Sequence, residues 1–106
     1  MPLGYTYIMG SATGVLYIGV TSEFNTRISQ HKTGAIEGFS KTYGCTRLLY
    51  YELYEDINTA IARETQLKGW RREKKLNLIR KQNPGFEDLA EKQGWQLITQ
   101  HEKMNT

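Results

Sequence analysis

The chain of 106 residues is poor in cysteine and has no long apolar run. Its single cysteine, Cys45, cannot form a disulfide within the chain, which favours a reducing compartment. The apolar runs are too short to span a bilayer or to form the core of a signal peptide. We therefore expect a cytoplasmic protein that does not associate with a membrane.

Linkers, low-complexity tracts and internal repeats are also missing from the sequence. The length suits one small domain with a single modest core. We expect this domain to occupy residues 1–92, followed by a partly packed C-terminal tail over residues 93–106. A monomer or a weak homodimer is expected.

Positive charge is concentrated in one segment of the chain. The net charge is only +3, but Glu73 is the one acid among many basic side chains between residues 68 and 81. Such a stripe either binds phosphates or is a solvated helix face with lysines for solubility. Its basic residues are Lys68, Arg71, Arg72, Lys74, Lys75, Arg80 and Lys81.

Apolar periodicity predicts three strands and several helices, in the order β-β-α-β-α-α. A short loop containing Gly14 should join the first two strands as an antiparallel hairpin. The fold class is therefore α+β, with a small three-stranded, mostly antiparallel sheet flanked by helices. The expected strands are residues 5–10, 15–20 and 46–54. The expected helices are residues 23–32, a helix from Asp56 or Asn58 to Lys68, and residues 70–81. We expect a loop at 34–44, a short helical turn at 86–92, and a last short strand or packed tail at 94–99.

Two tyrosines of the hairpin are candidate site residues. Side chains alternate across a strand, so Tyr7 and Tyr17 become cross-strand partners or diagonal neighbours about 5–8 Å apart. Ordinary aromatic packing is the alternative explanation. Gly19 lies on the same face as Tyr17 and leaves room for a phosphate to approach the backbone.

Arg27 and His31 are four residues apart and therefore share one face of the first helix. Apolar Phe24 and Ile28 lie beside them, so this face is directed toward the protein body. An arginine in that position needs an anion, which is either a substrate phosphate or a structural partner among the acids. The candidate structural partners are Glu23 and Glu52.

Glu64 lies within the apolar stripe of the next helix, between Ile61 and Leu67. A carboxylate in such a stripe is paired or binds a metal ion. Mg²⁺ commonly takes one or two protein carboxylates and completes its octahedron with water and phosphate. The alternative is a buried ion pair between Glu64 and Arg27.

Common zinc, nucleotide and redox motifs are missing, because the chain has no HExxH, paired CxxC, P-loop or glycine-rich dinucleotide loop. Cys45 is interpreted as a small buried apolar residue. The second histidine, His101, falls on the expected tail and receives no role.

Taken together, the segments Tyr5-Thr6-Tyr7 and Tyr17-Ile18-Gly19, followed by Arg27, His31 and Glu64, resemble the GIY-YIG nuclease superfamily. That group includes the N-terminal nuclease domain of a bacterial excinuclease and phage homing endonucleases. The resemblance covers roughly residues 4–89, and the segment from Ile61 to Asp88 resembles small single-domain bacterial members. The first motif lacks its own glycine and isoleucine, and Val20 follows Gly19 where some members have lysine.

The resemblance implies a divalent-metal-dependent endonuclease that uses Mg²⁺ or Mn²⁺. Tyr7 would be a general base or water-orienting group, Tyr17 the tyrosine of the second motif, and Glu64 the metal ligand. Arg27 would stabilise the phosphate, and either Tyr7 or His31 would take the proton from water. The expected substrate-binding residues are Gly19, Lys68, Arg71, Arg72, Lys75 and a late asparagine, for which Asn83 is preferred to Asn77.

The function predicted from the sequence is hydrolysis of phosphodiester bonds in nucleic acid, with DNA favoured over RNA. Cleavage is expected to be structure-selective, as in repair or recombination, and weak. The alternative is a nucleic-acid-binding module with little or no turnover, because the basic segment at residues 68–81 suits binding in either case.

Overall fold

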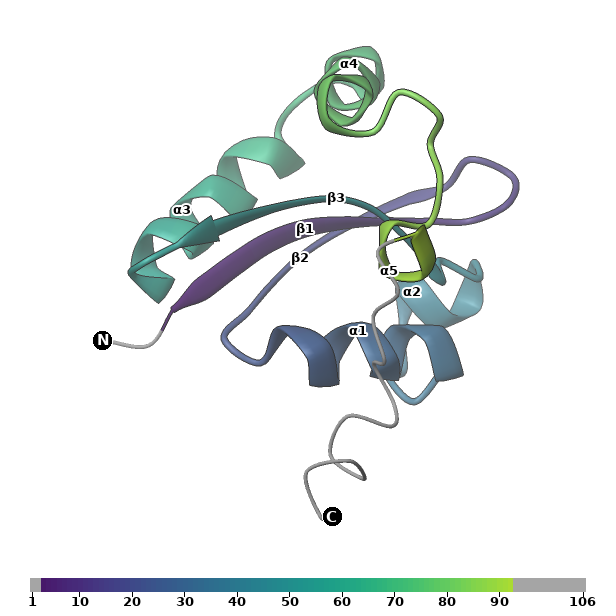
Figure 1. The fold of residues 1–106 in the computed structure, drawn as a ribbon, viewed down its shortest axis with the longest axis horizontal. Helices are drawn as coiled ribbons and strands as arrows, with labels where there is room; N and C mark the ends of the chain where they lie inside the picture. Colours follow the sequence, from purple (N-terminus) through teal and green to yellow (C-terminus); the bar gives the residue numbers. More distant parts are fainter. Residues whose placement is uncertain (1–2, 93–106) are drawn as a thin grey trace.

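A three-stranded antiparallel sheet with helices on both faces forms the molecule (Figure 1). The structure is a computed structural model that describes residues 3–92. The expected strand at 94–99 and the tail at 93–106 lie outside the described residues, and the boundary at residue 92 stays a prediction. The elements are β1 (Gly4–Gly10), β2 (Leu16–Thr21), α1 (Phe24–Thr33), α2 (Phe39–Thr42), β3 (Arg47–Tyr54), α3 (Ile57–Lys68), α4 (Arg72–Gln82) and α5 (Leu89–Lys92).

The sheet has the strand order β2-β1-β3, so β2 is an edge strand and β1 is central. Tyr7 pairs with Gly19 and Met9 pairs with Tyr17 across the hairpin. The two tyrosines are therefore diagonal neighbours on one face, as predicted. A register shift between Ile8 and Met9 interrupts the pairing of β1 with β3.

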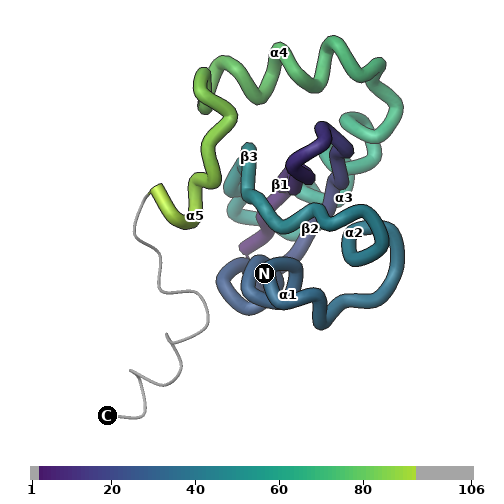
Figure 2. Tube along the Cα trace, turned by 90° about the vertical axis from the view of Figure 1, so that its right-hand side faces the viewer, coloured from purple at the N-terminus to yellow at the C-terminus, as the bar shows by residue number. Residues whose placement is uncertain are grey.

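Alternation along β1 divides the core into two layers. Tyr7 and Met9 face α1, α2 and α5, where they pack with Phe24 and Ile28 of α1. Ile8 faces the opposite side, together with further apolar residues of β2, β3, α3 and α4. In Figure 1 these helices lie on either side of the sheet, and Figure 2 shows α4 crossing above the strands while α1 lies below them.

Local sequence signals explain where the helices begin and end. Asp56 caps α3 by accepting a hydrogen bond from the Asn58 amide at 3.0 Å, as the sequence indicates. Gly34 ends α1 in the left-handed conformation, with a φ of 73°. The α1 N-cap is Glu23, and Thr21 accepts a hydrogen bond from the Glu23 amide at the start of the helix.

One expectation about the chain path was wrong. The segment at 34–44 was expected to be a loop, but it contains the short helix α2. Gly38 precedes this helix with a φ of 112°, a backbone conformation that glycine adopts without a steric penalty. This helix brings Ser40 into the interior and leaves the Phe39 and Tyr43 side chains about half exposed.

Candidate active site

The Tyr7 phenol is the centre of the candidate site. The side chain projects from the central strand over the edge strand and is fully buried. Its ring lies directly against Gly19, where a Cβ atom would collide with it. The expectation for Gly19 therefore needs correction, because the space that the glycine leaves is filled by Tyr7 and is not open to a phosphate.

His31 connects this phenol to α2. Its Nε2 lies 2.8 Å from the Tyr7 hydroxyl, and its Nδ1 lies 2.8 Å from Ser40 Oγ. Ser40 Oγ in turn donates to the Cys45 carbonyl at 3.3 Å. Burial, helped by the charge of Arg27, lowers the pKa of His31 to about 4, so the imidazole is neutral at pH 7.

Arg27 reaches the same phenol from the preceding turn of α1. Its side chain is partly buried and makes a hydrogen bond to Tyr7. Glu52, one of the structural partners considered for Arg27, is held by Arg63 through two contacts at 2.9 and 3.0 Å. The phenol and the imidazole near Arg27 are neutral groups.

Tyr17 is the partly exposed member of the tyrosine pair. Its ring centroid lies 6.5 Å from that of Tyr7 and 5.1 Å from that of His31. On its other side it stacks on Phe39, whose ring lies beside that of Tyr43. A continuous row of aromatic rings therefore leads from the buried phenol to the surface.

Glu64 lies in α3, on the opposite face of the sheet from α1 (Figure 1). It is flanked by buried Ala60 and Leu67, and its side chain is 17% exposed. The predicted inward position is right, but Ile61 is exposed and does not belong to the stripe. Its carboxylate pairs with Lys68 Nζ at 3.0 Å, so the Arg27 pair considered from the sequence is not needed to neutralise it.

The charge of Glu64 nevertheless acts at the Tyr7 hydroxyl. Burial raises the pKa of Tyr7 well above its usual value, and the neighbouring Tyr17 and Glu64 raise it further. The charge and the hydrogen bond of Arg27 oppose this shift. Groups from β2, α1 and α3 therefore all influence the pKa of this one phenol.

Glu64 offers a single carboxylate to a divalent cation. Within residues 3–92 no group of three or more histidine, cysteine or acidic side chains is placed to hold a metal ion. A partly buried single carboxylate suits Mg²⁺ or Mn²⁺, which complete their shells with water and phosphate oxygens. The current partner of this carboxylate, Lys68, is a flexible side chain that is 56% exposed and can move away.

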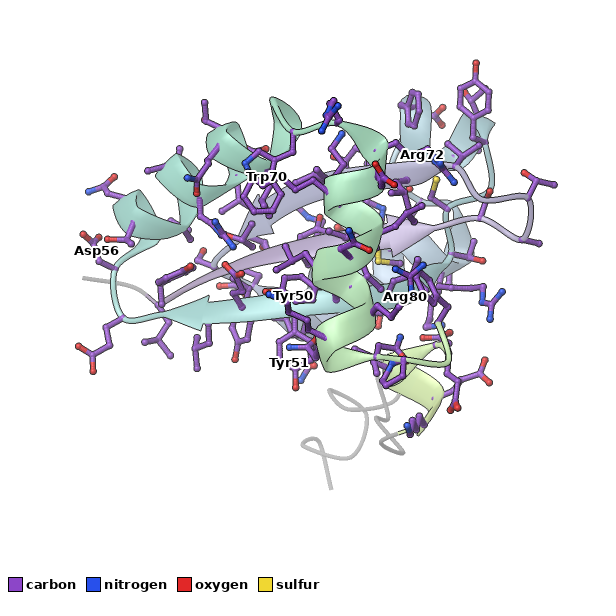
Figure 3. The ribbon with its side chains drawn as sticks, turned by 90° about the horizontal axis from the view of Figure 1, so that it is seen from above. Tyr50, Tyr51, Asp56, Trp70, Arg72 and Arg80 are labelled. Atoms are coloured by element: carbon purple, nitrogen blue, oxygen red, sulfur yellow. The ribbon has the colours of Figure 1, made fainter. Side chains whose placement is uncertain are left out.

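The basic residues divide between two places. Lys68 is bound to Glu64, and Arg71 is exposed between α3 and α4. Arg72 and Lys75 line a groove of about 400 Å³ together with the hairpin loop at 13–16 and Phe39. In Figure 3 Arg72 lies at the start of α4, on the side of the hairpin loop. The groove therefore joins the basic segment to the outer end of the aromatic row.

Asn83 does not belong to this site. It is buried, and its Nδ2 donates to the carbonyls of Leu49 and Glu87 at 3.1 and 2.7 Å. Its Oδ1 accepts from the Glu87 amide at 3.1 Å. The predicted role in substrate binding needs correction, because these hydrogen bonds fix the turn after α4. Asn77, the alternative, is exposed on α4 and accepts from Arg80.

Sequence reasoning missed Ser40 and the exposed pair Phe39 and Tyr43. Ser40 lies nine positions after His31, beyond the helix that carries it, so no helical spacing connects the two. The aromatic pair belongs to the segment that was expected to be a loop. Cys45 is buried, and burial raises the pKa of its thiol, which agrees with the interpretation as an apolar core residue.

Comparison with known proteins defines the family of this chain. The model of the GIY-YIG catalytic domain matches residues 3–77. UPF0213 proteins of Staphylococcus aureus strains Mu3 and N315 are each 34% identical over 76 residues, covering 72% of this chain and 93% of each relative. The chain belongs to the GIY-YIG family, and its domain is of the nuclease type.

A solved structure supports the same assignment. The solution NMR structure of the UPF0213 protein BH0048 from Bacillus halodurans has a TM-score of 0.55 and 25% sequence identity. The match covers 83% of this chain and 94% of that protein. The α+β fold predicted from the sequence is thus confirmed. In the part of the chain that is described, no helix has the length and apolar character needed to cross a membrane.

Proposed function

We propose that this protein is a metal-dependent endonuclease that hydrolyses phosphodiester bonds in DNA in a structure-selective manner. The observation that carries the proposal is the clustering of Tyr17 and Arg27 at the Tyr7 phenol, whose pKa the charge of Glu64 also raises. These groups come from separate elements, and packing of an apolar core alone does not require a guanidinium and a carboxylate there. A basic groove leads away from the same place.

Tyr17 is the phenol placed to meet substrate, because it is partly exposed whereas Tyr7 is fully buried. Its hydroxyl orients the attacking water by accepting one of its hydrogen bonds. As the water oxygen bonds to phosphorus and the bond to the 3′ oxygen breaks, Tyr17 passes a proton from that water to solvent. The departing 3′ oxygen takes a proton from solvent, so the products are a 5′-phosphate and a 3′-hydroxyl.

Arg27 stabilises the negative charge that grows on the phosphate oxygens in the transition state. A guanidinium presents a fork of donors that matches two phosphate oxygens while retaining a further donor for Tyr7. The neutral groups beside Arg27 leave its charge available for that anion.

Glu64 would hold the divalent cation once Lys68 leaves its carboxylate. When bound, Mg²⁺ or Mn²⁺ supplies charge stabilisation for the phosphate and for the leaving oxygen. The Lys68 side chain, released from Glu64, is then free to bind a phosphate further along the strand. Arg72 and Lys75 bind the backbone of the same strand through the groove beside the hairpin loop.

Cleavage of nicked, branched and supercoiled plasmid DNA with Mg²⁺ or Mn²⁺ tests this function. We expect Glu64→Gln and Arg27→Ala each to lower the rate by about a hundredfold or more. Glu37→Gln is the matched control, because the Glu37 side chain is 84% exposed and forms its ion pair with Lys41 rather than with a site residue. Equal rates for the wild type and both site variants would contradict the proposal.

A nucleic-acid-binding module without turnover is the second candidate. The observation in its favour is the Glu64–Lys68 ion pair, which occupies the expected metal ligand. In that case DNA would bind with an affinity that falls steeply with salt, because phosphate contacts release counterions, but no strand would be cut at any metal concentration.

A further inference from the structure

A row of hydrogen bonds runs from Arg27 through the interior to the backbone of Cys45. Arg27 bonds to Tyr7, and Tyr7 Oη lies 2.8 Å from His31 Nε2. His31 Nδ1 lies 2.8 Å from Ser40 Oγ, and Ser40 Oγ lies 3.3 Å from the Cys45 carbonyl. The Tyr7, His31 and Ser40 side chains are at most 3% exposed.

Both ends of this row fix the direction in which protons are donated. A guanidinium only donates, so Tyr7 Oη accepts from Arg27 and keeps its own proton for His31 Nε2. A carbonyl only accepts, so the Ser40 hydroxyl donates to Cys45 and its oxygen accepts from His31 Nδ1–H. The opposite tautomer of His31 would leave the Cys45 carbonyl and the Tyr7 proton without these partners.

We propose that Tyr7, His31 and Ser40 are positioning residues: a neutral hydrogen-bond chain anchored at the Cys45 carbonyl that holds the Arg27 guanidinium in the site. Every link donates in the same direction, away from the arginine. The consequence for catalysis rests on the proposed function, whereas the direction of the chain does not. The proposal replaces the expectation that Tyr7 or His31 takes a proton from water.

Burial and charge both favour positioning over proton transfer. A fully buried phenol has no surface at which to meet an attacking water. The pKa of Tyr7 is raised and that of His31 is lowered to about 4, so transfer of a proton from the phenol to the imidazole is strongly unfavourable. Neutral groups also leave the positive charge of Arg27 to the substrate.

The variant His31→Gln distinguishes a positioning role of His31 from a role as general base. The glutamine amide accepts through oxygen and donates through nitrogen, so it is able to replace both hydrogen bonds of His31, but it cannot serve as a base. We expect His31→Gln to keep kcat on supercoiled plasmid DNA with Mn²⁺ within about threefold of the wild type, whereas loss of a general base costs about a hundredfold or more. We expect His31→Ala to lower kcat by about tenfold. A glutamine variant no more active than the alanine variant would overturn the proposal.

Ser40 provides the second test. We expect Ser40→Ala to lower kcat about tenfold with little change in KM, and Ser40→Thr to restore it, because threonine keeps the hydroxyl. Ser29→Ala is the matched control, since Ser29 Oγ is buried and has no hydrogen-bond partner within the described residues. An unchanged kcat for Ser40→Ala would overturn the positioning role.

The tautomer of His31 is measured independently of any activity assay, by ¹H–¹⁵N correlation spectra of the metal-free, full-length protein. The signal is assigned by its loss in His31→Gln, which separates it from His101. A neutral ring with its proton on Nδ1 is expected in the wild type, and a shift of this equilibrium is expected in Ser40→Ala. A proton on Nε2 in the wild type would overturn the chain. Lack of cleavage by the wild type would refute only the proposed function.

Discussion

Two networks of tyrosine and partly buried arginine lie on opposite faces of the sheet, and they differ in which groups surround the arginine charge. On the face of α3 and α4, Glu52 accepts from Tyr50 and Tyr54 and forms a two-point ion pair with Arg63. On the face of α1, Arg27 instead meets a neutral phenol and a neutral imidazole. Within residues 3–92, the first arginine forms an ion pair with a carboxylate and the second forms none.

The pKa values follow the same division. Burial alone would raise the pKa of Glu52, but hydrogen bonds from Arg63, Tyr50 and Tyr54 outweigh it and hold that pKa below its usual value. Glu52 is therefore charged and fully occupied, and this cluster fastens α3 to β3. The arginine at the other face, Arg27, acts on the Tyr7 phenol and the His31 imidazole, and no carboxylate in residues 3–92 forms an ion pair with it. Stability thus explains the first network, whereas the second suits the phosphate ligand of the proposed function.

We expect the largest loss of stability from a substitution that breaks the Glu52 cluster. Arg63→Ala leaves a carboxylate that is 16% exposed without its counter-ion, so it should lower the free energy of unfolding by about 3 kcal/mol. Arg63 also packs its guanidinium over the Trp70 ring, 5.1 Å from the ring centroid, and loses that contact as well. Urea unfolding measures the change.

Lys41→Ala is the control for that prediction, because it removes a lysine from an exposed ion pair with Glu37. Such a pair contributes at most about 0.5 kcal/mol. If the Arg63 and Lys41 variants lose similar amounts of stability, the Glu52 cluster is not a structural anchor and the contrast between the two networks fails.

On the other face of the sheet, we expect protonation of His31 to cause a smaller, pH-dependent loss of stability. Its pKa is about 4 in the folded protein and near 6.5 when unfolded, so the unfolded state binds more protons between these values. Stability should therefore be fully present above pH 6.5 and decrease as the pH falls toward 4. Between pH 7 and 5 the contribution from His31 amounts to about 2 kcal/mol.

Urea unfolding of the wild type and of His31→Gln at both pH values isolates this contribution. The wild type should lose more stability than the variant, because the glutamine does not titrate, while carboxylates affect both proteins alike. The interval stops at pH 5 so that the acids remain mostly ionised. Parallel losses in the two proteins would mean that His31 is not held neutral by the fold.

The sequence predicts the fold well where local patterns repeat. Alternation of apolar side chains places Tyr7 and Tyr17 on one face, and the short hairpin loop fixes their diagonal register. Helical spacing places Glu64 in one apolar stripe with the buried Leu67, although the same stripe wrongly includes the exposed Ile61. These features depend on residues that are close in the chain, and short-range geometry determines them.

Features that depend on packing between distant segments cannot be predicted from local sequence patterns. Ser40 becomes the partner of His31 only because α2 folds back onto α1. Gly19 is required by the Tyr7 ring from the neighbouring strand. Asn83 looked like a site residue, but its hydrogen bonds fix a turn. Residue type and spacing therefore predicted that Tyr7, Tyr17, Arg27 and His31 lie near one another, whereas burial is what distinguishes the roles proposed for them.

The smallest predicted effect concerns Lys68. It is the counter-ion of Glu64, just as Glu52 is the counter-ion of Arg63. The pair is 3.0 Å apart, but the lysine is 56% exposed, so its loss should be worth only a few tenths of a kcal/mol. Because Lys68 competes with a cation for the same carboxylate, Lys68→Ala should tighten Mn²⁺ binding about two- to threefold. Calorimetric titration of DNA-free protein with Mn²⁺ measures this, and Lys41→Ala controls for the loss of one positive charge. If both variants bind Mn²⁺ equally well, Lys68 does not compete with the cation for the Glu64 carboxylate, and Glu64 is then not the metal ligand.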